Sequence, residues 1–292
     1  MGVLPRSIQP TSRQLIFSLF CAACFMALFW PTFTWLAERF DAHDSFYSHG
    51  WLIPFASAWL IWQRRVQWEA CPRASSYRGL ALLAPSLLIH LVATRLDLHF
   101  ASGFAMLGVI WGLVWTCWGW RMLWTLRFPM LFLLFMVPLP GVLLISISFK
   151  MKMMAATLAT HALHLMQIPA EQAGSTINVP GVSVVVDDTC SGLRSLISLI
   201  ALSVFWTSFM PAASRQWQKL AIVAASIPIA LAANMVRILA LVLLAAIYGS
   251  HAAEGYLHYG SGIVVFVVAL AILAWMTRWI QQWSLPSLGL NQ

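Results

Sequence analysis

LAIVAASIPIALAANMVRILALVLLAAI, residues 220–247, is the stretch that decides the fold of this chain. Its one ionisable side chain is Arg237, and nearly all of its other residues are apolar. A helix needs about 20 predominantly apolar residues to cross a bilayer. The stretch is therefore predicted to be a transmembrane helix that carries a charged residue, Arg237, near the middle of the membrane.

The composition of the whole chain agrees with a membrane protein. Of 292 residues, 61% are hydrophobic and 9% are charged, and the mean hydropathy is +0.80. Soluble domains carry about 25% charged residues. This composition excludes an ordinary soluble enzyme, a disordered protein and a disulfide-rich secreted domain. The five cysteines are dispersed and odd in number, so they form no disulfide framework.

Apolar segments follow one another along the chain without a hydrophilic linker between two halves. They lie at 14–36, 50–63, 79–94, 100–120, 123–140, 141–168, 191–210, 217–247 and 258–277. The segment 141–168 carries Lys150 and Lys152 near its middle, where a lipid-facing charge is costly. It is predicted to be an amphipathic helix at the outer membrane interface. The fold class is an all-α integral membrane protein of about eight transmembrane helices, in one polytopic domain of residues 1–292.

The charges indicate the orientation of these helices. The net charge is +8, but the basic residues are spread singly between apolar segments, which excludes a nucleic-acid partner. With the N-terminus inside, most Lys and Arg residues fall on the inner side, as the positive-inside rule requires. Most Asp and Glu residues fall outside. Both termini are therefore predicted to be cytoplasmic, in a multi-pass protein of the lipid bilayer.

Residues 169–189 form the longest outer connection. The sequence STINVPGVSVVVDD, residues 175–188, alternates β-branched residues around Pro180 and Gly181. This pattern predicts a short β-hairpin. The hairpin would deliver Cys190 to the start of the next transmembrane helix.

Cys190 is the first candidate for chemistry. A helix is predicted to begin near Ser191, and helix N-termini favour anions such as a thiolate. Arg194 would lie over the same face if Cys190 is helical, and Gly192 allows another backbone to approach closely. A buried, inert cysteine beside a snorkelling arginine is the alternative interpretation.

Two acids precede this cysteine. Asp187 and Asp188 oppose thiolate formation by like-charge repulsion. They could instead orient a histidine or receive a substrate cation.

Two further candidates lie closer to the C-terminus. Asn234 and Arg237 are three residues apart and share a helix face, and an intramembrane arginine is a functional candidate by default. His258 precedes the last apolar segment, and imidazole suits proton transfer near neutral pH. Cysteine, arginine and histidine are a nucleophile, an oxyanion stabiliser and an acid–base group, which is the set that acyl transfer requires.

The remaining histidines and cysteines carry weaker signals. His161 and His164 have the spacing of metal ligands, but no companion acid follows at a fixed distance, so no metal site is predicted. Cys21 and Cys24 form a CxxC inside an apolar segment, which indicates packing rather than redox chemistry.

Several motifs together resemble the exosortase/archaeosortase family of membrane transpeptidases, of the PEP-CTERM type. The motifs are Ser48–Pro54 followed by Trp62–Arg65, Phe128–Pro140, Cys190–Ser195, Asn234–Arg237, and Glu254–His258 with Gly262. The catalytic motifs concentrate in residues 182–262. The resemblance implies Cys190, Arg237 and His258 as catalytic residues, with Asn234, Arg194, Ser191, Gly192, Asp187 and Asp188 in support.

The resemblance also implies a function. Exosortases act on membrane-anchored proteins whose C-terminal sorting signal comprises a short motif, a transmembrane helix and a basic tail. Cleavage would occur on the outer face of the bacterial inner membrane through a thioester acyl-enzyme, in systems that accompany exopolysaccharide production. No metal or organic cofactor is expected. Asp187 and Asp188 depart from the family pattern, which leaves the cognate motif open.

Two other classes of function stay open at this point. One is a transporter or lipid-linked sugar flippase that uses Arg237 and the outer acids as a substrate or proton site. The other is a non-catalytic scaffold of an exopolysaccharide export system. Trapping of a thioester to a substrate peptide would separate these classes from a transpeptidase.

Overall fold

The computed structural model describes residues 12–43, 45–188, 190–211, 214–249 and 256–282. Contacts within the chain group it into two compact units, each assembled from two stretches of sequence. The first unit consists of Met1–Arg39 and Arg64–Arg127, and the second of Phe40–Gln63 and Phe128–Gln292. All the candidate residues of the Cys190, Asn234–Arg237 and His258 motifs belong to the second unit.

The first unit is helical. Its elements are α1 (Ser12–Leu28), most of α2 (Trp30–Asp41), α4 (Arg65–Glu69), the 3-10 helix η2 (Tyr77–Gly79), α5 (Leu80–Arg95), α6 (His99–Trp118) and α7 (Trp120–Thr125). Helices α5 and α6 pack closely because Gly112 leaves no side chain between them: a Cβ there would lie 2.8 Å from the backbone nitrogen of Leu83.

A buried polar network links the helices of the first unit. Nδ1 of His90 lies 2.8 Å from Oγ of Ser102, and Nε2 lies 3.2 Å from the carbonyl oxygen of Leu28. The Ser102 hydroxyl also pairs with that of Thr32. Because both ring nitrogens have partners, His90 has a structural role in this unit.

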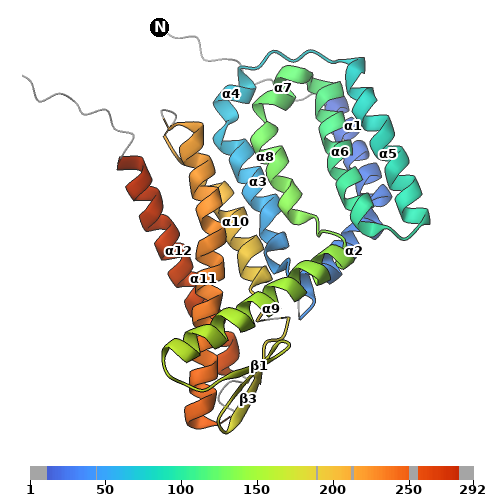
Figure 1. Ribbon diagram of the computed structural model, residues 1–292. Coiled ribbons are helices and arrows are strands. Elements are labelled where there is room, and N and C mark those ends of the chain that lie inside the picture. Colours follow the sequence, from blue (N-terminus) through green and yellow to red (C-terminus); the bar gives the residue numbers. More distant parts are fainter. Residues whose placement is uncertain (1–11, 44, 189, 212–213, 250–255, 283–292) are drawn as a thin grey trace, which may run out of the picture. The chain divides into compact units, whose positions relative to one another are not determined.

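The second unit contains the remaining elements (Figure 1). They are η1 (Ser48–Trp51), α3 (Leu52–Gln63), most of α8 (Arg127–Phe132), η3 (Leu133–Met136), α9 (Gly141–Leu165), β1 (Glu171–Ala173), β2 (Thr176–Val179), β3 (Val182–Val185), α10 (Leu193–Thr207), α11 (Gln216–Tyr248) and α12 (Tyr256–Gln282). Helices α10, α11 and α12 contact one another and run side by side, while α9 crosses them obliquely near one end.

The three strands form one antiparallel sheet in the order β1-β2-β3. Strands β2 and β3 pair from Thr176 with Val185 to Val179 with Val182, and the turn between them is Pro180–Gly181. Gly181 has a φ of +87°, which glycine adopts without steric cost. The structure adds a third strand, β1, which pairs with β2.

The sheet closes an apolar core over α9 and α11. Inward residues alternate along β2, and Ile177 is fully buried. The core residues are Ala155, Ala156, Ala159, Leu163, Ala170, Ile177, Val179, Val186, Cys190, Ile238, Leu241 and Val242. We call this cluster the sheet core. A second cluster joins α10, α11 and α12 through Leu199, Ile222, Ala230, Ala269 and Leu273, among others.

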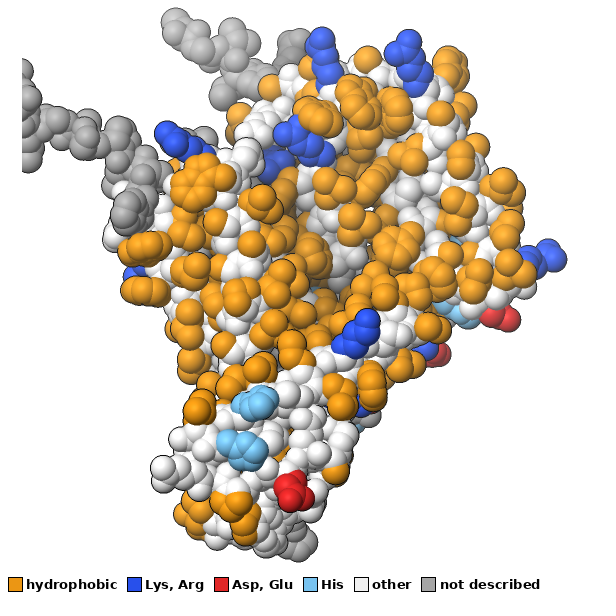
Figure 2. Space-filling view, in the orientation of Figure 1, with side chains coloured by type: hydrophobic (Ala, Val, Ile, Leu, Met, Phe, Trp, Pro, Cys, Tyr) orange, Lys and Arg blue, Asp and Glu red, His pale blue; other side chains and the backbone are white. Residues whose placement is uncertain are grey.

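In the described part of the chain, candidate membrane spans are fewer than the eight that the sequence predicts. Among the described residues, five helices are long and apolar enough to cross a membrane, and one of them is α9, for which the sequence predicts a place at the membrane interface instead of a span. The number is six if Leu19–Leu28 and Trp30–Asp41, which meet at a 65° bend, form one span. Figure 2 shows hydrophobic side chains along most of the visible face of α11 and α12. The protein is therefore a multi-pass helical membrane protein.

Three of the eight predicted spans fold into shorter helices. The segments are 50–63, 123–140 and 191–210. Pro129 lies within the broken segment that forms α8 and η3. The helices Arg127–Met136 and Leu193–Thr207 are both shorter than the 18 residues that a candidate span needs. The 15 residues of α10 extend about 22 Å, less than the hydrocarbon core of about 30 Å. Hydropathy measures how apolar a segment is, whereas helix length also depends on where the backbone turns.

Candidate active site

Cys190 lies in a turn between the sheet and α10. Its N–H donates to Oδ1 of Asp187 at 2.9 Å and to the Asp187 carbonyl at 3.2 Å. Ser191 donates from its hydroxyl to the Asp188 carbonyl at 2.8 Å. The helix begins at Leu193 rather than at Ser191, so Cys190 is not helical. The carboxylate of Asp187 therefore holds the Cys190 backbone in this turn.

The Cys190 side chain faces the sheet core. The residue is 4% exposed and packs with Ile238 and Val242 of α11. A buried cysteine behaves as a small apolar residue unless a cation or a base reaches the thiol.

Asn234 binds the carbonyl group of Cys190, whereas Asp187 binds its N–H. Its Nδ2 donates to the Cys190 carbonyl at 2.9 Å, and the residue is 4% exposed. Gly192 makes this contact possible: it has a φ of +79°, and a Cβ there would lie 2.6 Å from Cγ of Asn234. The glycine of the cysteine motif and the asparagine of the arginine motif are therefore in direct contact.

Arg237 lies almost one turn beyond Asn234 on α11. Its Nε donates to Oγ of Ser261 at 3.3 Å, and its Cζ would lie 3.5 Å from a Cβ on Gly262. The guanidinium therefore lies close to Gly262 on α12, at a distance that would be ordinary van der Waals contact even for an added Cβ. The motifs of α11 and α12 meet at this point.

Arg237 lies on a helix that is longer than a bilayer requires. Helix α11 has 33 residues and extends about 50 Å, which exceeds a hydrocarbon core of about 30 Å. Arg237 comes 18 residues after Lys219 (237 − 219), about 27 Å along the axis. The length of α11 therefore fits a bilayer at more than one depth, and the mid-membrane position of Arg237 stays a prediction.

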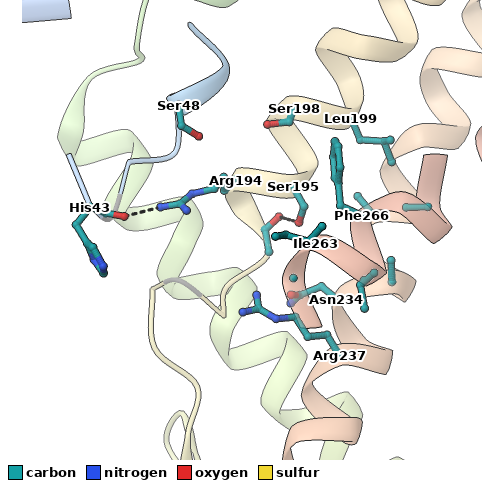
Figure 3. Close-up of a pocket in the computed structure, with 16 residues that line it drawn as sticks. His43, Ser48, Arg194, Ser195, Ser198, Leu199, Asn234, Arg237, Ile263 and Phe266 are labelled. Carbon is teal, nitrogen blue, oxygen red and sulfur yellow. Dashed lines mark hydrogen bonds between the residues drawn. The ribbon is translucent and has the colours of Figure 1, made fainter. Parts of the chain in front are cut away.

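Arg194 does not pair with Cys190. Its Nη2 donates to the carbonyl of His43 at 2.9 Å. The expected shared face required a helical Cys190, and the turn at Gly192 removes that geometry. Arg194 instead projects from the first turn of α10 toward the segment before η1 (Figure 3).

The two acids bind neighbouring groups of the chain, whereas the sequence suggested that they orient a histidine or receive a substrate cation. Asp187 caps the N–H of Cys190. Asp188 accepts from Nζ of Lys152 at 2.9 Å and from Ser148 at 2.9 Å, both on α9. The hydrogen bond from Lys152 holds the pKa of Asp188 below its usual value. Lys152, which the sequence indicated only as a charge unfit for a span, anchors the cysteine loop to α9.

A cavity of about 440 Å³ lies within the second unit, lined by Gly192, Arg194, Asn234 and Arg237 of the predicted site, whereas Cys190 is not among its lining residues (Figure 3). Its lining residues are His43, Ser48, Gly192, Arg194, Ser195, Ser198, Leu199, Ala230, Ala233, Asn234, Arg237, Gly262, Ile263, Val265, Phe266 and Ala269. Two arginines and several hydroxyls share this lining with apolar side chains from α10, α11 and α12. No acid lies among these lining residues. A ligand with both apolar and polar groups fits such a cavity.

His258 belongs to the first turn of α12, one turn before Ser261. Its side chain lies outside the described part of the structure. The predicted triad is thus described for Cys190 and Arg237, while the histidine is located by its backbone alone.

One polar pair was not predicted. Nδ1 of His49 lies 3.0 Å from Oγ of Ser198, a residue that lines the cavity. The sequence signals were the place of His49 among the histidines of the predicted outer segments and the resemblance of Ser48–Pro54 to an early family block, and neither assigns this histidine a role.

The fold and the cavity define a multi-pass helical membrane protein with a buried cysteine beside an arginine-lined pocket. Residues 35–275 match the family model described as transmembrane exosortase (Exosortase_EpsH). Because the match covers more than half of the chain, the chain belongs to this family. The match confirms the resemblance that the motifs predict. No curated protein and no solved structure matches the chain.

Proposed function

We propose that this exosortase is a membrane-embedded cysteine transpeptidase that cleaves C-terminal sorting signals of the PEP-CTERM type. The observation that carries the proposal is the contact between the motifs. Asn234 binds the backbone of Cys190, while Arg237, on the same helix, lines the adjacent cavity with Gly192 and Gly262. Family membership supports the reaction class, and the apolar cavity supports a substrate that is itself anchored in the bilayer.

The first half of the proposed reaction forms a thioester. The Cys190 thiolate attacks the scissile carbonyl carbon, and the negative charge moves to the carbonyl oxygen. The C–N bond then breaks, and His258 donates a proton to the leaving amine. The acyl group is now bound to sulfur, and the C-terminal segment of the substrate departs.

The second half releases the acyl group. His258 accepts a proton from an acceptor amine or from water, and the acceptor attacks the thioester carbonyl. The C–S bond breaks and regenerates the thiolate. Transfer to an amine gives transpeptidation, whereas attack by water gives hydrolysis.

The oxyanion role falls on Arg237 in this proposal. Backbone N–H groups near Ser191 are a second kind of donor that could help Arg237 in this role. The N–H of Cys190 donates to Asp187, and the N–H of Ser191 donates to the Asp188 carbonyl at 3.3 Å. Both groups are therefore already engaged in the turn. A guanidinium in a partly apolar cavity stabilises a developing oxyanion strongly.

The proposed partners are exported proteins with a sorting motif, a transmembrane helix and a basic tail. The enzyme would lie in the inner membrane with its active site facing the periplasm. The orientation of α9 tests this topology, since Ser146 and His161 are both exposed on it. If α9 lies at the outer interface, Ser146→Cys and His161→Cys both react with an impermeant maleimide added outside. Reaction of only one of them would mean that α9 crosses the membrane.

The central experiment follows the processing of a co-expressed sorting-signal substrate in membranes. We expect Cys190→Ala to abolish processing, and Arg237→Ala to reduce its rate by about 10²- to 10³-fold. His258→Ala should reduce it by about 10²- to 10⁴-fold. Cys117→Ala removes an exposed thiol outside the site and His161→Ala an exposed histidine, and both should leave processing intact.

The same experiment separates the competing classes of function. A thioester between Cys190 and the substrate, trapped by rapid acid quench and released by hydroxylamine, would support the transpeptidase. Normal processing by the Cys190→Ala variant would refute it. A transporter or a scaffold predicts that thiol alkylation leaves function unchanged.

A further inference from the structure

The segment before α3 contributes a polar pair to the wall of the cavity. Nδ1 of His49, in η1, lies 3.0 Å from Oγ of Ser198, in the second turn of α10. Ser198 and the neighbouring Ser48 both line the cavity. Figure 3 shows the Ser198 hydroxyl directed toward the side on which Ser48 lies.

Packing fixes the position of the His49 ring. The ring of Tyr47 stacks on it with centroids 5.8 Å apart, and the Tyr47 hydroxyl accepts the N–H of Leu139 at 3.2 Å. Gly50 follows directly, and Phe40 occupies the space where a Cβ would be, with its Cε1 2.2 Å from that position. The imidazole therefore reaches Ser198 from a rigid support.

The second ring nitrogen has no partner among the residues that the structure describes. Nε2 of His49 is buried and makes no hydrogen bond within the described part of the chain. A buried polar atom without a partner costs about 1–3 kcal/mol. Buried polar atoms without a partner are rare in native proteins, and a functional role is one of the recognised reasons for them. Burial also lowers the pKa of His49 to about 4, so the ring is neutral at pH 7.

A neutral imidazole can bind Ser198 in two ways. If Nδ1 is unprotonated, it accepts a hydrogen bond from the Ser198 hydroxyl, and the serine oxygen can still accept a hydrogen bond from a ligand in the cavity. If Nδ1 carries the proton, it donates to the oxygen, and the hydroxyl can donate into the cavity. A second partner normally selects the tautomer of a histidine. Since Nε2 has none among the described residues, both arrangements are open.

A peptide group is the ligand that matches this chemistry. It is uncharged, and it offers both an N–H donor and a C=O acceptor. A charged ligand group would find better partners in Arg194 and Arg237, which line the same cavity. The wall beyond Ser198 is apolar, with Leu199 and Phe266, and suits the side chains that flank a peptide group.

We propose that His49 and Ser198 form a positioning pair in which the imidazole orients the Ser198 hydroxyl to hydrogen-bond a backbone peptide group of the substrate. The inference rests on the proposed function in that the ligand is the sorting-signal peptide. His49 acts through Ser198 and takes no part in the chemical step.

The test measures peptide binding separately from catalysis. A fluorescent peptide, comprising the C-terminal sorting segment of a PEP-CTERM protein from the same genome, is titrated into the full chain in detergent. The chain carries Cys190→Ala so that no turnover occurs. We expect Ser198→Ala to weaken Kd about fivefold, as the loss of one neutral hydrogen bond predicts. Ser203→Ala removes a buried hydroxyl of the same helix outside the cavity and should leave Kd unchanged.

Substitutions of His49 distinguish positioning from structural support. The His49→Asn variant places a polar atom near the position of Nδ1 and should retain Kd within about twofold. The His49→Gln variant reaches toward the position of Nε2 instead, and it should weaken peptide binding as much as Ser198→Ala does. The double variant His49→Phe with Ser198→Ala replaces both partners by apolar groups, which restores packing. It should melt like the parent chain and still bind about fivefold more weakly.

Either of two results would overturn the inference. One is an unchanged Kd for a Ser198→Ala variant that melts normally. The other is recovery of the parent Kd in the double variant, which would show that the pair only supports the fold. Failure of the proposed catalysis is a separate outcome, because it appears as normal processing by the Cys190→Ala variant and leaves the Kd comparison valid.

Discussion

Replacement of Gly192 by alanine tests the contact that joins the cysteine motif to the arginine motif. Gly192 has a φ of +79°, where an L-residue costs about 1–2 kcal/mol. Its new Cβ would lie 2.6 Å from Cγ and 2.8 Å from Nδ2 of Asn234, and such overpacking costs about 1–3 kcal/mol. The hydrogen bond from Asn234 to the Cys190 carbonyl, worth about 0.5–1.5 kcal/mol, would also be lost.

The variant should therefore lose about 2.5–6.5 kcal/mol of unfolding free energy, as the sum of these three costs. Displacement of Cys190 by about 1 Å should slow processing about 100-fold. The matched control is Gly181→Ala, which has a φ of +87° but nothing within 4 Å of the added Cβ. It should cost about 1–2 kcal/mol and leave processing intact.

Two assays check this prediction. Chemical denaturation in detergent gives the unfolding free energies, and the membrane processing assay gives the rates. Addition of Asn234→Ala to the Gly192→Ala variant removes two of the three atoms that crowd the new Cβ. This should restore part of the stability without restoring processing. If Gly192→Ala is as stable and as active as Gly181→Ala, the proposed contact has no functional importance.

Three further predictions concern neighbouring contacts. Asn234→Ala alone should slow processing about tenfold, because it removes one buried hydrogen bond from the cysteine turn; wild-type kinetics would contradict this. Lys152→Met, which breaks the ion pair with Asp188, should cost no more than about 1 kcal/mol in denaturation assays, because the Asp188 side chain is 58% exposed. Its effect should exceed that of Lys150→Met on the same helix, and equal effects would count against the anchor. Burial lowers the pKa of His49 to about 4, so its contribution to stability is present above pH 6.5 and declines as pH falls toward 4. Melting curves at pH 7.5 and pH 5 should show a larger acid-induced loss for the wild type than for His49→Asn, and equal losses would refute this.

Part of the candidate site could be predicted from local sequence. The motifs around Cys190, Asn234 and His258 are short and contiguous, so the resemblance they carry was visible without coordinates. The turn at Pro180–Gly181 was equally readable, because turn chemistry depends on the residues at the turn itself.

Other features depend on residues that are distant in sequence. The Asn234 bond to Cys190 joins positions 44 residues apart, and the His49 bond to Ser198 joins positions 149 apart. Arg194 was expected to lie over Cys190. However, Gly192 is left-handed and α10 begins only after it, at Leu193, so Cys190 is outside the helix and Arg194 binds the carbonyl of His43. No local pattern contains these pairings.

The sequence by itself determined that the chain belongs in a membrane and which short motifs resemble exosortases, because hydropathy and motif identity are properties of contiguous residues. Tertiary structure alone decided how many helices are long enough to span, which partners the two acids bind, and which residues line the cavity. The physical reason is that the hydropathy of an apolar segment is the same whether its helix is straight or broken. Its breaks, and the contacts between distant polar groups, depend on how the helices pack.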